Sequence, residues 1–249
     1  MVSNIDEAFI MYEKRYNLSK IAVESGIYDE DFNTLDSKNK FLLLAYKLRE
    51  SKKLNLASFF FGKLFELTSN LEALINKIDC LIELNEYDEA NRLNNLALEL
   101  YLEDPSINTL EVEKKLNYQK GLIAFFTDKL NYAQWICEES IVRYMSVEFF
   151  CLLCAVFISF SDYENAKKIY NKYGTKFSTN FEFLFEVFLL LENTDNVKKA
   201  IDFISMLPNI NEKQIDELIN SISIHYNLFS KDKDNFKKCF EKIFIDENI

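Results

Sequence analysis

The sequence predicts an all-α protein built as a stack of antiparallel helical hairpins, and three observations predict it. The chain of 249 residues contains only 4 Gly and 2 Pro, fewer breakers than the turns of a sheet protein require. Apolar-rich segments alternate with amphipathic segments along most of the chain. Between them recurs a short turn-like motif that ends in a small residue. We therefore expect about six hairpins in a single domain, residues 1–249.

The recurring motif is clearest in two places, EYDEA at 86–90 and DYENA at 162–166. Looser copies end at Ala57, Ala133, Ala200 and Cys239. The small residues are 33, 43, 33, 34 and 39 positions apart, and three of these intervals match a helical-repeat period of about 34 residues. A bulky residue three positions before the small one marks a turn and the start of a second helix, and the small side chain lets that helix pack closely on its partner.

The segments on either side of each motif have helical patterns. The apolar first helices are expected at 41–48, 71–84, 116–126, 147–160, 181–191 and 215–228. A second helix follows each motif, as Ala90, Leu93, Ala97 and Leu100 show by recurring at intervals of three and four.

The ends of these segments carry stop and start signals. Asp36 or Ser37 is expected to cap the first hairpin, and Gly174 to end the second helix of the fourth. A helical cap is expected near 5–23, so that residues 1–36 form a cap with its connection and residues 37–249 form the hairpins. Residues 102–113 lengthen the 43-residue interval as a longer loop or an extended helix.

The spacing and the turn-to-small-residue motif resemble the tetratricopeptide-repeat family over roughly residues 40–245. Ala45, Gly121 and Cys154 stand at the family's small position on the first helix, whereas Ile78 and Phe188 depart from it. The resemblance implies a right-handed superhelical solenoid whose first helices line a concave groove that binds another polypeptide.

Carrying the groove positions over by this resemblance gives a set of candidate partner-binding residues. They are Tyr46, Arg49, Asp79, Glu83, Tyr118, Leu122, Phe125 and Phe126, followed by Ile158, Phe185 and Leu189. The central part of the set is apolar and aromatic, which suits an amphipathic helix or an extended peptide. Helical periodicity cannot separate a binding face from a buried one, so the same side chains could instead form core.

Residues that could carry chemistry are few. His225 is the only histidine, and no nucleophile is selected as its partner. Cys151 and Cys154 have the spacing of half a zinc site, but the sequence has no second pair, and a core role is favoured. We therefore expect no enzymatic activity, no cofactor and no metal site.

Charge and cysteine content narrow the class of partner. The net charge of −11 argues against nucleic acid and against an anionic membrane surface. Five cysteines in apolar surroundings, and a first segment unlike a signal peptide, favour a cytoplasmic protein, or a nuclear one in a eukaryote. We expect a scaffold or adaptor that belongs to a larger complex. A secretion-type or assembly chaperone for a hydrophobic segment is the alternative, and an enzyme on a helical-repeat frame is less favoured.

Overall fold

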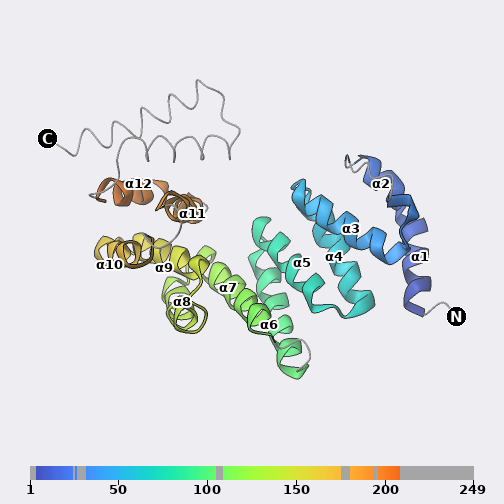
Figure 1. The fold of residues 1–249 in the computed structure, drawn as a ribbon, viewed down its shortest axis with the longest axis horizontal. Helices are drawn as coiled ribbons and strands as arrows, with labels where there is room; N and C mark the ends of the chain where they lie inside the picture. The colour runs from blue at the N-terminus through green and yellow to red at the C-terminus, as the bar shows by residue number, and fades with distance from the viewer. Residues whose placement is uncertain are drawn as a thin grey trace, which may run out of the picture. The chain divides into compact units, whose positions relative to one another are not determined.

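The computed structural model describes residues 4–24, 26, 32–104, 109–174, 180–192, 194 and 196–207. Within these ranges the secondary structure is entirely helical, as predicted (Figure 1). The chain divides into two compact units, Met1–Ile123 and Ala124–Ile249, and the boundary falls inside one helix. The expected single domain stays a prediction. The sixth hairpin and His225 lie outside the described residues.

Unit 1 consists of successive helices that pack on their neighbours in the sequence. They are α1 (Asn4–Tyr16), α2 (Leu18–Glu24), a 3₁₀ turn (Phe32–Thr34), α3 (Ser37–Glu50), α4 (Leu54–Thr68), α5 (Leu71–Glu83), α6 (Tyr87–Glu103) and most of α7 (Leu110–Phe126). The hairpins are α3–α4 and α5–α6, and α4 also packs on α5. Asp36 caps α3 as predicted, because its carboxylate accepts a hydrogen bond of 2.8 Å from the Asn39 amide.

Unit 2 continues with the end of α7 and five further helices. They are α8 (Leu130–Tyr144), α9 (Val147–Ser159), α10 (Tyr163–Ile169), a π-helical turn (Tyr170–Gly174), α11 (Asn180–Glu192) and α12 (Val197–Ser205). The apolar run of the sequence forms α9, which contacts α8, α10, α11 and α12 and is therefore the central helix of this unit. The helix ends at Gly174 as expected, but its last turn is not α-helical. The regular α-helix stops at Ile169, and residues Tyr170–Gly174 form a π-helical turn.

The turns inside the first four hairpins share one geometry. A residue with left-handed backbone stands at Lys52, Asn85, Asp128 and Ser161, with φ between 58° and 62°. The amide of the following residue then donates to the carbonyl five positions earlier, at 2.8–2.9 Å, in the pairs Lys53–Leu48, Glu86–Leu81, Lys129–Ala124 and Asp162–Phe157. This is the Schellman arrangement that ends helices. The left-handed residue thus stops the first helix and directly precedes the recurring sequence motif. The small residue of the next helix follows five positions after it.

Replacing Ser161 with glycine is expected to raise the free energy of unfolding by about 0.5–1 kcal/mol. A residue with a Cβ pays about 1–2 kcal/mol for the left-handed conformation, and the extra freedom of glycine in the unfolded chain offsets part of the gain. The urea midpoint should rise for Ser161→Gly and should not rise for Ser161→Ala, which keeps the Cβ. An equal rise in both variants would show that the backbone conformation is not the cause.

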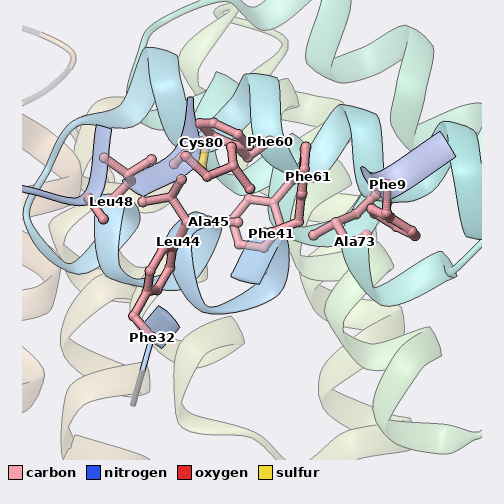
Figure 2. Close-up of a cluster of buried hydrophobic side chains, with 14 residues drawn as sticks. Phe9, Phe32, Phe41, Leu44, Ala45, Leu48, Phe60, Phe61, Ala73 and Cys80 are labelled. Carbon is pink, nitrogen blue, oxygen red and sulfur yellow. The ribbon is translucent and has the colours of Figure 1, made fainter. Parts of the chain in front are cut away.

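The small residues of the motif lie where the prediction placed them. Ala57, Ala90, Ala133 and Ala166 are fully buried, and Ala200 is nearly so. In unit 1 the larger core side chains around them are mostly aromatic and include Phe9, Phe41, Phe60 and Phe61 (Figure 2). The Phe41 ring makes edge contacts with Phe9 and Phe60, with ring centres 5.4 and 5.3 Å apart.

The N-terminal helix α1 packs on α3 and α4 and closes the side of this core that Phe9 fills. A partly buried ion pair reinforces the contact, because the Lys40 ammonium lies 2.7 Å from the Glu13 carboxylate, which also accepts a hydrogen bond from Ser37. Burial alone would raise the pKa of Glu13, but the bonds from Lys40 and Ser37 hold it below its usual value. The predicted segment near 5–23 is therefore two helices, α1 and α2, separated at Asn17, where φ is 47°.

Candidate functional site

Polar side chains from the first helices of successive hairpins meet in unit 1, on α3, α5 and α7. Hydrogen bonds and ion pairs join them into one network, which we call the polar ladder. Its members are Tyr46, Arg49, Lys52, Glu72, Asn76, Asp79, Glu83, Lys115 and Gln119. The partners of a single contact are 26 to 40 residues apart in the sequence. The ladder is therefore a product of the repeat, which places equivalent helix faces side by side.

Arg49 of α3 lies at the centre of the ladder. Its guanidinium donates to the Asn76 side-chain oxygen at 2.5 Å and to the Asp79 carboxylate at 2.9 Å, both on α5. The Glu83 carboxylate, one turn further along α5, is 4.0 Å away and also pairs with Lys52 at 2.7 Å. Because arginine presents several donors in a fixed plane, one side chain can hold three acceptors of the neighbouring helix.

Tyr46, one turn before Arg49, extends the ladder toward the start of α5. Its hydroxyl donates to Glu72 at 2.9 Å and accepts from Asn76 at 3.4 Å. Partial burial, together with the hydrogen bond to Glu72, raises the pKa of Tyr46, so the phenol keeps its proton as a donor. Glu72 has no ion-pair partner among the described residues, which leaves its carboxylate able to accept from an incoming group.

Gln119 of α7 anchors the other side of the ladder in the interior. Its side chain is 1% exposed, and its amide nitrogen donates to the Asp79 carboxylate at 2.5 Å and to the Ile75 carbonyl at 2.9 Å. Its oxygen accepts from the buried Asn94 of α6 at 3.3 Å. Lys115, one turn earlier on α7, lies 3.6 Å from Asp79 at the surface. Asp79 is therefore held by α3 and α7 at once, and its position is fixed before any partner arrives.

A small pocket adjoins the Tyr46 end of the ladder. Its floor is apolar and comes from Phe61, Leu64 and Ala73, all buried. Leu42, Tyr46, Glu72, Lys38, Thr68 and Asn70 complete its wall. An apolar floor beside a few polar groups of fixed orientation is the usual composition of a binding pocket.

Comparison with known proteins shows which fold the chain has. No family model and no curated protein matches the sequence. Similar solved structures exist: PilW, a widely conserved type IV pilus biogenesis factor, has a TM-score of 0.52 and 18% identity over 88% of this chain and 99% of its own. A tetratricopeptide repeat protein from Parabacteroides merdae has a TM-score of 0.52 and 14% identity over 96% of each chain. MamA from Desulfovibrio magneticus RS-1 has a TM-score of 0.50 and 13% identity over 75% of this chain and 97% of that one.

The chain has a tetratricopeptide-like helical-repeat fold. The predicted fold class is thereby confirmed, together with the assignment of first and second helices in the described hairpins. In this tetratricopeptide-like fold the equivalents of the family's small position, Ala45, Ile78, Gly121, Cys154 and Phe188, are all buried. The departures at Ile78 and Phe188 therefore change the size of the buried side chain and not the role of the position.

The structure brings together four of the eleven predicted partner-binding residues. Tyr46, Arg49, Asp79 and Glu83 all belong to the polar ladder. Tyr118 and Leu122 lie half-buried on α7 within unit 1, and their role stays a prediction.

One of the third-repeat aromatics, Phe125, requires a correction, and the role of Phe126 stays a prediction. Phe125 is 1% exposed, so its ring is part of the core of unit 2 and offers no surface to a partner. The adjacent Phe126 is half-buried, with its ring centre 5.5 Å from that of Phe125. Ile158 is also buried, while Phe185 and Leu189 are half-buried. Of the two interpretations of the apolar set, core therefore holds for Phe125 and Ile158.

Sequence reasoning missed five members of the ladder: Lys52, Glu72, Asn76, Lys115 and Gln119. Asn76 lies three residues before Asp79 and within the apolar stretch Leu74–Ile78, where a polar side chain requires a partner. Gln119 has polar neighbours in the sequence, and only its spacing of three from Leu116 and Leu122 places it on the apolar side of α7. A polar residue on the buried side of an apolar helix was the available signal, although it does not reveal which residue the partner is.

Among the described residues, the cysteines and the possible metal ligands are not arranged for other chemistry. The described cysteines Cys80, Cys137, Cys151 and Cys154 are free and buried. Burial raises the pKa of the Cys80 thiol to about 11 and raises those of the other three as well, which opposes formation of the reactive thiolate. Within the described ranges, no three His, Cys, Asp or Glu side chains cluster as metal ligands would. In the same ranges no helix is both long enough and apolar enough to cross a membrane.

Proposed function

We propose that this chain is a scaffold or adaptor subunit that binds a segment of another polypeptide along the polar ladder and its adjoining pocket. The observation that carries the proposal is the prearranged ladder. Eight of its nine polar side chains lie on three neighbouring helices and Lys52 lies in the turn after α3. Hydrogen bonds and ion pairs join them, so a partner meets most of these side chains already ordered. The tetratricopeptide-like fold supports the same role, and we propose no catalytic activity.

The composition of the site favours one class of partner. An extended or helical peptide offers backbone and side-chain hydrogen-bonding groups to the ladder and one apolar side chain to the pocket. A wholly hydrophobic segment, of the kind a secretion or assembly chaperone would cover, would leave the charged groups of Asp79, Glu83 and Lys115 desolvated without new partners. The adaptor role is therefore the better fit. The buried free thiols suit a reducing compartment, and we propose the cytoplasm or nucleus.

Binding can be tested with two leucine variants that differ only in their place. Leu42 is 39% exposed at the pocket wall, and Leu56 of α4 is 43% exposed and does not line the pocket. The partner is first identified by affinity capture from the source organism and mass spectrometry, and its binding segment is then titrated in a calorimeter. We expect Leu42→Glu to weaken binding at least tenfold and Leu56→Glu to leave it unchanged. Equal affinity in both variants, or a wild-type chain captured alone, would refute the proposal.

A further inference from the structure

The second helix of the third hairpin, α8, exposes a row of large apolar side chains in unit 2. Tyr132 is 40% exposed, Trp135 55%, Val142 84% and Met145 61%. The rings of Tyr132 and Trp135 stack with centres 5.8 Å apart and planes 10° apart, so each ring supports the other. We call these four residues the α8 face. Isolated exposed apolar residues are common, but here three lie along one side of a single helix and the fourth, Met145, is its C-cap, which is typical of an interaction surface.

The α8 face is distinct from the part of α8 that already contributes to the core. Ala133, Ile136, Cys137 and Ile141 are buried and hold the helix against α9. From Tyr132 to Met145 the exposed row runs about 20 Å along the axis, since a helix rises about 1.5 Å per residue. The helix is therefore apolar on two sides. Packing within unit 2 accounts for one side only.

Charges on the α8 face indicate what covers it. Glu138 and Glu139 are exposed in the middle of the row, between Trp135 and Val142. Neither has an ion-pair partner among the described residues, and Glu138 accepts a hydrogen bond of 2.8 Å from Gln134. The exposed cation Arg143 lies toward the end of the helix, over the Tyr144 ring. An apolar row with two carboxylates at its centre complements an apolar row flanked by cations.

A second copy of this chain is a poor occupant. If two α8 helices packed antiparallel about a two-fold axis through the middle of the row, Glu138 and Glu139 would face their own copies. Burying like charges in contact costs several kcal/mol, and no cation of the row lies near the centre to offset it. An anionic membrane surface would be repelled by the same carboxylates and by the net charge of −11.

We propose that the α8 face docks a basic amphipathic helix of about four turns from a partner protein. Its apolar side would cover Trp135 and Val142, and its Lys or Arg side chains would pair with Glu138 and Glu139. This surface belongs to a different helix and a different unit from the polar ladder, so the inference does not depend on the proposed function. A chain with both surfaces could join two polypeptides.

Trp135 makes the test direct, because it is the chain's single tryptophan and its fluorescence reports on this face alone. The probe is a synthetic peptide of about 18 residues, Leu on one helical face and Lys on the other. The control peptide has the same composition in an order without helical periodicity. We expect a saturable blue shift of Trp135 emission with the first peptide only. Val142→Glu should weaken this response at least tenfold, whereas Leu102→Glu, at a 72% exposed leucine of α6, should not change it.

Three outcomes would overturn the inference. The first is an equal shift with the control peptide, which would show that the net charge of the peptide, and not an amphipathic helix, causes the response. A concentration-dependent shift without peptide would identify a second copy as the occupant. Finally, a shift on adding phosphatidylcholine vesicles would identify a lipid surface. Circular dichroism of each variant verifies that the helices are retained.

Discussion

The variant Phe41→Ala is expected to lower the free energy of unfolding of unit 1 by about 3–5 kcal/mol. Phe41 is fully buried and makes edge contacts with Phe9 of α1 and Phe60 of α4 (Figure 2). Removing the ring leaves a cavity where three helices meet, and the two neighbouring rings cannot both move into it. Since domains are stable by only about 5–15 kcal/mol, a loss of this size is a large part of the total.

The adjacent residue provides the control for Phe41. Leu42 lies on the same helix but is 39% exposed, so Leu42→Ala should change stability by less than about 1 kcal/mol. Urea denaturation followed by circular dichroism measures both variants. Hydrogen exchange should show faster opening of α1 and α3 in Phe41→Ala than in the wild type. Equal losses in the two variants would contradict the packing described for this core.

A second large effect is expected for Gln119→Leu, about 2–4 kcal/mol of destabilisation. The substitution keeps the size of the buried side chain but removes two donors and one acceptor. The Ile75 carbonyl, one oxygen of Asp79 and the amide of Asn94 each lose the bond that Gln119 supplied. A buried polar group left without a partner costs about 1–3 kcal/mol. Water can hydrate the partly exposed Asp79, so the total cost is smaller than the sum over the three groups. Urea denaturation measures the loss of stability.

The variant Asn94→Leu, combined with Gln119→Leu, tests whether the loss of stability comes from broken hydrogen bonds or from the altered shape of the side chain. The Asn94 side-chain oxygen already has no partner in the interior, so its removal recovers part of the cost of the bonds lost. We expect the double variant Asn94→Leu/Gln119→Leu to be more stable than the sum of the two single losses, by about 0.5–2 kcal/mol. Strict additivity would show that the two residues do not form the linked pair that the structure contains.

The helices could be predicted because their signals are local. The motif ending in Ala90 or Ala166 directly follows the left-handed residue that stops the first helix and ends in the close-packing residue, and both lie within five positions. The expected first helix at 71–84 corresponds to α5, Leu71–Glu83, for the same reason. Such segments specify their structure without reference to the rest of the chain.

The candidate site could be predicted only in part, because its signals are not local. Tyr46, Arg49, Asp79 and Glu83 were found by position within the repeat, which fixes the helix face. Gln119 could not be assigned to Asp79, since the two are 40 residues apart and nothing in the periodicity links them. Phe125 was wrong as a surface residue because a helical period of apolar side chains is the same whether a neighbouring helix or a partner covers it.

The central claim is that another polypeptide lies along α3 and α5 beside the polar ladder. The most direct measurement places a photo-reactive benzophenone side chain at position 42 or, in a second strain, at position 56, and irradiates living cells of the source organism. We predict a covalent adduct with one polypeptide from position 42, at the pocket wall, and none from position 56. Adducts in equal yield from both positions, or from neither, would contradict the account.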